Sequence, residues 1–317
     1  MLETTKKQED IHITGAPQIP GLRFRHFRGD EDYAQILAII NGSKDADGVE
    51  RSDTLEDITN NYQHLTNCDP FSDMLFAEIN GKTVAYSRVF WYQEENGPRI
   101  YYTFGFMLPE WRRKGMGTAM LHWNEARLRE IAAGHPQNGR RFLQAEVSDG
   151  EGSTIALLER QGYRPARYGF EMKRALSEPF PEAPMPAGLE VRPVEPEHLR
   201  PIWDAASEAF RDHWGYSPPK EEDYQQWLND PLLDPSLFKI AWEGDEVAGM
   251  VQNFVNLNEN EEYERQRGYT EGICVRRSWR KRGLAKALIV QSMQMFKAMG
   301  MTETALGVDA ENTSGAL

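Results

Sequence analysis

The sequence has little cysteine and too few basic residues to balance its acidic ones. Its two cysteines, Cys68 and Cys274, stand far apart and form neither a disulfide framework nor a metal-ligand spacing, which fits a reducing cytoplasm. Lysine and arginine total 36 against 49 aspartates and glutamates, which gives a net charge of −13. This charge predicts no bulk attraction to nucleic acid or to an anionic membrane, and it slightly favours a cationic or amine ligand.

Long apolar runs are missing as well. The longest run, residues 36–40, has about five residues, whereas crossing a bilayer takes about 20. Residues 1–20 lack the apolar stretch of a signal peptide. Together these absences predict a soluble, cytoplasmic protein.

The length of 317 residues corresponds to roughly two domains, and the chain repeats itself. Three pairs of segments recur at a near-constant spacing of 163 to 168 residues, which predicts a tandem duplication. The pairs are residues 21–25 with 188–192, 80–85 with 243–248, and 111–117 with 279–285. We expect an N-terminal tail over 1–20, a first domain over 21–176, a proline-rich linker over 177–188 and a second domain over 189–317.

Each copy has the same predicted order of elements. A strand and a helical region precede a hairpin, which turns at Asn80-Gly81 in copy one and at Gly244-Asp245 in copy two. A further strand, a glycine-containing turn, a long helix and another strand follow. Copy one then adds a helix and two short strands, around residues 164–168 and 170–174. This order predicts an α/β domain with one mixed central sheet in each copy.

The turn between strand and long helix carries the most specific motif, Arg-x-x-Gly-x-Gly/Ala. Small residues at a helix N-terminus expose backbone amides, and nearby cations add donors, so each turn predicts a pyrophosphate cradle. A basic turn with a glycine cap is the plainer reading, but two copies at the same place disfavour it. A dinucleotide-binding turn fits poorly because Met120 and Leu288 replace its third glycine, and a P-loop motif is absent.

These turns resemble the acyl-CoA signature of the GNAT superfamily of N-acetyltransferases, and the similar element order covers nearly the whole chain twice. The tandem layout and the Arg211-Asp212-His213-Trp214-Gly215 stretch also resemble mycothiol synthase-like proteins. The resemblance implies acetyl-CoA as cosubstrate and no metal. It also implies a strand amide that binds the thioester carbonyl. By this resemblance the acyl-CoA contacts are Met107, Arg112, Arg113, Lys114, Gly115, Met116 and Gly117 in copy one, and Ile273, Cys274, Val275, Arg280, Lys281, Arg282, Gly283, Leu284 and Ala285 in copy two.

Copy two is the better catalytic candidate. An alkylamine with a pKa near ~10 must lose a proton before it attacks, so a carboxylate or an ordered water has to accept that proton. Strand alternation places Glu271 on the same face as Ile273 and Val275, while the 168-residue offset places Thr103 at the corresponding position of copy one. Copy one also has Leu158 where many members of the family have a tyrosine. A solvated strand-end acid is the alternative role for Glu271.

Other candidates lie outside the motif. Cys274 could be a nucleophile, but alternation puts it on the face opposite Glu271, and a buried structural cysteine is the preferred interpretation. The loop that contains His213, Trp214 and Tyr216 is the candidate acceptor pocket, with ordinary packing as the alternative.

The sequence thus predicts direct transfer of an acetyl group from acetyl-CoA to a primary amine of a small molecule. The alternatives are a non-catalytic acyl-CoA-binding module and an acetyltransferase that acts on a protein amine. Copy two stops at Leu317, where its next helix is due, so we expect the natural protein to continue for roughly 25 residues, by analogy with copy one.

Overall fold

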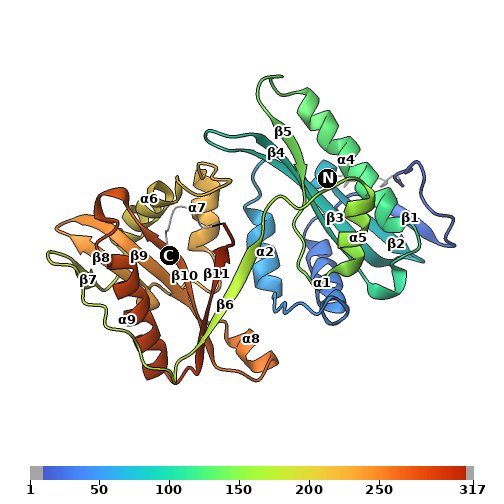
Figure 1. Ribbon diagram of the computed structural model, residues 1–317. Coiled ribbons are helices and arrows are strands. Elements are labelled where there is room, and N and C mark those ends of the chain that lie inside the picture. Colours follow the sequence, from blue (N-terminus) through green and yellow to red (C-terminus); the bar gives the residue numbers. More distant parts are fainter. Residues whose placement is uncertain (1–9, 312–317) are drawn as a thin grey trace, which may run out of the picture. The chain divides into compact units, whose positions relative to one another are not determined.

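The computed structural model describes residues 10–311 and divides into two compact units. Unit 1 ends at Arg164, and unit 2 begins at Pro165. Each unit has one mixed sheet with helices on its faces, which confirms the predicted pair of α/β domains (Figure 1).

Unit 1 contains a five-stranded sheet in the order β1-β2-β3-β4-β5. Only the pairing of β4 with β5 is parallel. The elements are β1 (Leu22–Arg25), α1 (Tyr33–Asp47), α2 (Leu55–Gln63), α3 (Pro70–Asp73), β2 (Met74–Ile79), β3 (Lys82–Gln93), β4 (Arg99–Met107), α4 (Met116–Ala133), β5 (Arg141–Gln144) and α5 (Gly152–Arg160).

Two apolar layers hold the sheet of unit 1. The α1 side chains Ile36, Ile39 and Ile40 pack on one face against Phe76 and Tyr86. On the other face, α4 packs its first turns against β2 and β3. The hairpin between β2 and β3 turns at Asn80 and Gly81, which have φ angles of 50° and 81°, as the Asn-Gly dipeptide predicts.

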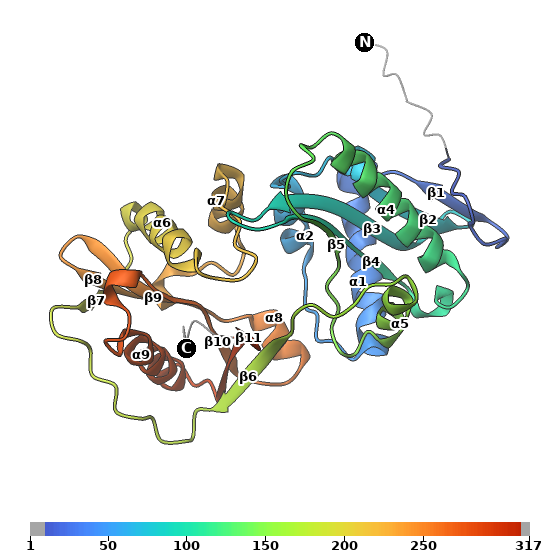
Figure 2. The same cartoon turned by 45° about the horizontal axis from the view of Figure 1, so that its top comes forward.

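Unit 2 contains a six-stranded sheet in the order β6-β11-β10-β9-β8-β7. The helices α6 and α9 cover opposite faces of this sheet (Figure 2). The elements are β6 (Gly169–Ala175), β7 (Glu190–Arg192), α6 (Leu199–Phe210), α7 (Glu221–Leu228), β8 (Lys239–Glu243), β9 (Glu246–Phe254), α8 (Leu257–Glu262), β10 (Arg267–Val275), α9 (Leu284–Ala298) and β11 (Glu303–Asp309).

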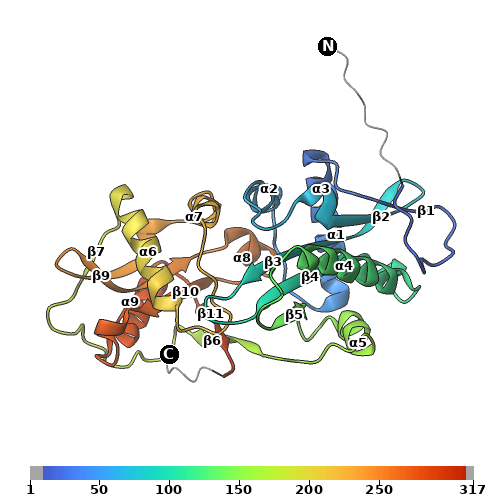
Figure 3. The same ribbon diagram turned by 90° about the horizontal axis from the view of Figure 1, so that it is seen from above.

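The strand β6 differs from the sequence expectation. We expected residues 170–174 to close the first sheet, but β6 pairs antiparallel with β11 from Ala175↔Glu303 to Gly169↔Asp309 (Figure 3). Pairing gives the otherwise open edge of β11 a full set of backbone partners. The proline-rich residues 177–188 therefore connect β6 to β7 within unit 2, and the break between the units falls at Arg164 rather than after residue 176. Residues 312–317, where the next helix was expected to begin, lie outside the described residues.

Candidate functional site: two amide cradles and their neighbouring forks

Both motif turns adopt the same backbone conformation. The second motif residue is left-handed in each copy, with φ 61° at Arg113 and 60° at Lys281, and Gly115 and Gly283 follow with φ 88° and 85°. The helices α4 and α9 begin at the next residue, and neither glycine cap is accompanied by a side-chain hydrogen bond. The first-turn amides of each helix have no intrahelical acceptor, which is the geometry that the predicted anion cradle requires.

The first arginine of each motif forms contacts within its own unit. Arg112 donates from Nε to the Met107 carbonyl at 2.9 Å and binds both carboxylate oxygens of Asp47. Arg280 repeats this arrangement, with Nε 2.8 Å from the Val275 carbonyl and an ion pair to Asp212. The guanidinium of Arg112 thus joins the end of β4 to the end of α1. That of Arg280 joins the end of β10 to the end of α6 and to Asp212, which follows α6. These contacts show that Arg112 and Arg280 position the turn, and their contact with phosphate stays a prediction.

The other motif cations also have protein contacts. Lys114 Nζ lies 4.6 Å from the Trp111 ring centroid. Arg282 donates to the Ala187 carbonyl at 3.2 Å. The motif residues whose backbone forms the turn are Arg113, Gly115, Met116 and Gly117 in unit 1, and Lys281, Gly283, Leu284 and Ala285 in unit 2.

Sequence reasoning missed the two aspartates that bind the motif arginines. Asp47 is 4% exposed and also accepts from Arg51, which in turn pairs with Glu151 at the start of α5. Asp212 is bound by Arg277 and Arg280, and their hydrogen bonds hold the pKa of its carboxyl below the usual range. The available signal was an aspartate at a similar distance before the motif in both copies, 65 residues before Arg112 and 68 before Arg280.

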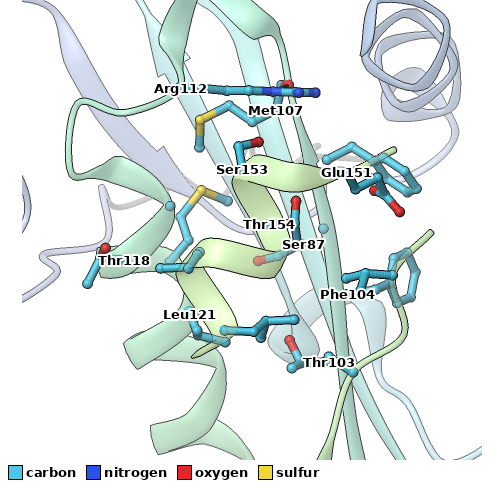
Figure 4. Close-up of a pocket in the computed structure, with 18 of the residues that line it drawn as sticks. Ser87, Thr103, Phe104, Met107, Arg112, Thr118, Leu121, Glu151, Ser153 and Thr154 are labelled. Carbon is cyan, nitrogen blue, oxygen red and sulfur yellow. Dashed lines mark hydrogen bonds between the residues drawn. The ribbon is translucent and has the colours of Figure 1, made fainter. Parts of the chain in front are cut away.

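A cavity of about 460 Å³ adjoins the cradle of unit 1. The strands β4 and β5 pair as far as Tyr102↔Gln144 and then separate, which opens a fork beside the first turn of α4. Figure 4 shows Met107, Arg112, Phe104 and Thr103 around this space, together with residues of α5. Leu158 lines it as well, so the position expected for a tyrosine general acid is apolar in unit 1.

The fork of unit 2 holds Glu271. The parallel pairing of β10 and β11 ends at Tyr269↔Ala305, and Glu271 Oε1 accepts from the Gly307 amide of β11 at 2.7 Å. Burial raises the pKa of this carboxyl, and the Gly307 hydrogen bond opposes the shift. Glu271 is therefore a half-buried carboxylate at the separation point of two strands.

A β-bulge changes the face that was expected for Glu271. Glu271 pairs with Gln252 and Cys274 with Met250, so β10 carries one extra residue between them, where Gly272 has φ 57°. Cross-strand partners project to the same side, and Met250 and Cys274 pack together toward α6. Glu271 thus shares a face with Cys274, whereas Ile273 and Val275 pack in the cluster beside α9.

The bulge also changes which residue of unit 1 corresponds to Glu271. In unit 1, β3 and β4 pair without interruption, and Arg88↔Phe104 stands where unit 2 has Gln252↔Glu271. Thr103 corresponds instead to Thr270, and both are almost fully buried. After the bulge, corresponding residues of the two copies are 168 residues apart, as Met107 and Val275 are. Before the bulge they are 167 apart, as Thr103 and Thr270 are.

Cys274 lies in the core beside Ile202, Ala205 and Ala209. Burial raises the pKa of its thiol to about 12. The side chain is therefore a thiol at neutral pH, and only its backbone can contribute to a ligand site.

The predicted acceptor loop is anchored to the cradle of unit 2. Asp212, next to His213, binds Arg280, and Tyr216 Oη lies 2.9 Å from Ser207 Oγ. The half-exposed ring of Trp214 lies under the Arg167 guanidinium at 5.1 Å. Arg167 pairs with Asp309 at the end of β11. This loop and the end of β11 are therefore neighbours.

Two further properties bear on the site. Over residues 10–311, His, Cys, Asp and Glu side chains form no group of three or more that could hold a metal ion. No helix within the same residues has both the length and the apolar character that spanning a membrane requires.

A strand, a left-handed turn and a helix N-terminus beside a strand fork, present in both units, define an acyl-CoA-dependent transferase fold. The model of the Acetyltransferase (GNAT) family matches residues 36–163 and 199–315. The chain belongs to the GNAT family of acetyltransferases, as a tandem member.

Relatives with the same layout cover nearly the full chain. A mycothiol acetyltransferase of Geodermatophilus obscurus is 25% identical over 284 residues, which is 89% of this chain and 87% of the relative. A mycothiol acetyltransferase of Salinispora tropica is also 25% identical, over 89% of this chain and 86% of its own length.

Solved structures share the fold. A GCN5-related N-acetyltransferase from Sphaerobacter thermophilus superposes with a TM-score of 0.67 at 24% identity, over 95% of this chain and 90% of that one. A tandem GNAT protein from the clavulanic acid biosynthesis pathway superposes with a TM-score of 0.59 at 15% identity, over 92% and 91% of the two chains.

Proposed function

We propose that this acetyltransferase moves the acetyl group of acetyl-CoA to a primary amine of a small molecule, and that unit 2 performs the transfer. When bound, acetyl-CoA supplies an acetyl group activated as a thioester. The names of the relatives as mycothiol acetyltransferases support a small-molecule acceptor. The observation that carries the assignment to unit 2 is Glu271 at the β10–β11 fork.

The residues of unit 2 divide the work as follows. The first-turn amides of α9 and the left-handed turn at Lys281 and Gly283 hold the pyrophosphate of the cosubstrate. Asp212 and Arg280 fix that turn to the end of β10. Glu271 accepts the proton of the attacking amine, since burial raises the pKa of this carboxyl and makes it a stronger base than an exposed glutamate. His213, Trp214 and Tyr216 border the acceptor.

The cradle and cavity of unit 1 fit the same cosubstrate. Its turn exposes the same amides, and Gly117 lines the cavity, where an added Cβ would stand 3.4 Å from Leu157. Phe104 replaces the carboxylate and Leu158 replaces the tyrosine, so unit 1 is assigned binding or scaffolding without turnover.

The test is release of coenzyme A with a panel of small primary amines, by wild type and by Glu271→Gln. We expect the substitution to lower turnover by about 10²- to 10⁴-fold and to leave acetyl-CoA affinity unchanged. Glu197→Gln, at an exposed glutamate of the same unit, is the matched control and should not change the rate. Unchanged turnover in Glu271→Gln would remove Glu271 from the mechanism and return unit 1 to consideration.

A further inference from the structure

Unit 1 contains a buried arginine that has no counter-ion among residues 10–311. Arg88, in β3, is 8% exposed, and its guanidinium carbon lies 4.8 Å from the ring centroids of both Tyr62 and Phe104. Its Nη1 donates to Asn61 Oδ1 of α2 at 2.9 Å. No carboxylate of residues 10–311 lies within 4 Å of the Arg88 guanidinium, and Nε is buried without an acceptor.

The other buried arginines of the described residues form ion pairs. Arg25, 3% exposed, pairs with both Asp32 and Glu78, and Arg267, also 3% exposed, pairs with Glu303. An uncompensated buried charge is costly, so proteins keep such a charge mainly where a partner completes it. Aromatic contacts alone offset only a small part of that cost.

The neighbours of Arg88 offer a second donor but no anion in contact. The Tyr62 hydroxyl has no hydrogen-bond partner within 3.5 Å in the described part of the chain, and burial raises its pKa to about 12 although Arg88 opposes the shift, so it stays protonated. Burial likewise raises the pKa of the nearby Cys68 thiol to about 12, which excludes a thiolate. Two buried donors with no acceptor are thus left at one place.

This place adjoins the cavity of unit 1. Phe104 pairs directly with Arg88 across the strands, contacts its guanidinium, and lines the cavity. Tyr86 and Phe106, on the same face, also line the cavity, so a ligand there meets aromatic surface. Arg88 and Tyr62 are therefore one side chain away from a space large enough for a small organic molecule.

We propose that unit 1 binds a small organic carboxylate, with Arg88 as the residue that receives the carboxylate group. Nη1 is engaged by Asn61, which leaves the edge formed by Nε and Nη2 for a planar, side-on carboxylate. The Tyr62 hydroxyl provides a further donor, and the body of the ligand occupies the cavity beside Phe104. The half-buried Phe104 ring turns to admit the carboxylate.

The equivalent position of unit 2 supports this division. There the cross-strand pair is Gln252 and Glu271, so the corresponding pair holds a cation on β3 in unit 1 and an acid on β10 in unit 2. The proposal concerns binding in unit 1 and goes beyond the transfer assigned to unit 2, so each can fail without the other.

The experiment measures binding of phenylacetate and of its neutral isostere phenylacetamide to the full chain by titration calorimetry, without acetyl-CoA. We expect wild type to prefer phenylacetate by at least about tenfold, as charge-assisted hydrogen bonds predict. Arg88→Gln, which installs the residue of unit 2, should reduce that preference to within about twofold. Gln252→Ala, at the matching position of unit 2, should leave the preference intact.

Further arms keep the result decisive. Tyr62→Phe retains Arg88 and should weaken phenylacetate severalfold, and acetyl-CoA binding by the same variants reports whether the fold is intact. Inorganic phosphate, which the two proposed cradles can bind, should not displace phenylacetate if the Arg88 site selects a planar anion. The proposal is overturned if wild type shows no carboxylate preference, if Arg88→Gln keeps that preference, or if phosphate displaces phenylacetate.

Discussion

At the residue scale, the turn of each unit depends on an aspartate that is far away in the sequence. Asp47 and Asp212 bind the first arginine of their motifs, and that arginine also caps the carbonyl of the last strand residue. Arg112 and Arg280 therefore connect the aspartate, the end of the strand and the motif turn. In each unit the guanidinium fixes the turn whose backbone amides we propose as the phosphate-binding groups.

We predict that Asp47→Asn destabilises the protein by about 1.5–3 kcal/mol, because Asp47 is buried and its hydrogen bonds to Arg112 and Arg51 are charge-assisted. Chemical denaturation measures the change. The exposed pair of Asp10 with Arg23 is the control, and Asp10→Asn should change stability by less than about 1 kcal/mol. Equal effects of the two substitutions would contradict a bracing role for Asp47.

Glu271 gives a pH prediction. Burial holds the pKa of this carboxyl above its ordinary value of 4.5, so the base form appears at a higher pH than for an exposed glutamate. We expect kcat/KM of wild type to rise with pH as Glu271 loses its proton. This rise should be absent in Glu271→Gln, which has no carboxyl group at this position. Rates measured across pH 4–8 check this.

The same shift has a consequence for stability. Below the unfolded pKa both states are protonated, and as the pH rises the unfolded chain loses its proton first, so the folded state loses stability. Glu271→Gln should therefore be as stable as wild type near pH 4 and slightly more stable at pH 8. A variant that is less stable at pH 8 would show that ionised Glu271 supports the fold.

At the element scale, the bulge in β10 separates the two copies. It adds one residue, moves Glu271 to the α6 side and leaves Gly272 with φ 57°. In the uninterrupted β4 the corresponding residue is Phe104. A single inserted residue thus decides which chemistry the strand presents at its fork.

Gly272→Ala should cost about 1–2 kcal/mol for its left-handed backbone and should also lower turnover, because an added Cβ would stand 3.0 Å from Gln252 and displace the bulge. Gly244→Ala is the matched control, since Gly244 has φ 60° and an added Cβ meets nothing within 4 Å. Denaturation and rates of both variants separate backbone strain from displacement of Glu271. An equal fall in turnover in both variants would show that the position of Glu271 at the bulge does not determine the rate.

The sequence was informative where the evidence is local. The Asn80-Gly81 hairpin and the two motif turns follow from neighbouring residues, and the structure places each as expected. The aspartate partners were missed because they come from contacts 65 and 68 residues away. The face of Glu271 was wrong because alternation assumes an uninterrupted strand, and nothing in residues 271–274 other than Gly272 signals a bulge.

At the scale of the whole molecule, the boundary between the sequence repeats does not coincide with the boundary between the folded units. The second repeat starts near residue 188, but unit 2 starts at Pro165 because β6 belongs to its sheet. The residues after α5 therefore serve the second sheet although they precede the second repeat. A family pattern read along the chain assigns them to the first copy, whereas backbone pairing assigns them to the other.

The position of β6 in unit 2 predicts how stable unit 2 is when it is produced alone. A chain that starts at Pro165 should unfold cooperatively, and a chain that starts at Ser177 should be markedly less stable, because it lacks the seven residue pairs of β6 with β11. Each lost backbone hydrogen bond is worth about 0.5–1.5 kcal/mol. Thermal unfolding followed by circular dichroism compares the two chains, and equal midpoints would show that β6 adds nothing to unit 2.

The pairing of β6 also sets an order of events during synthesis. Its partners in β11 lie 128 to 140 residues later in the chain, so at ribosomal rates of about 5–20 residues per second β6 waits roughly 6 to 28 seconds for its neighbour. Unit 1 is complete in sequence before β6 leaves the ribosome. During the wait, the backbone N–H and C=O groups of β6 that later pair with β11 have no strand beside them. The nascent second half therefore carries an unpaired strand until β11 has been synthesised.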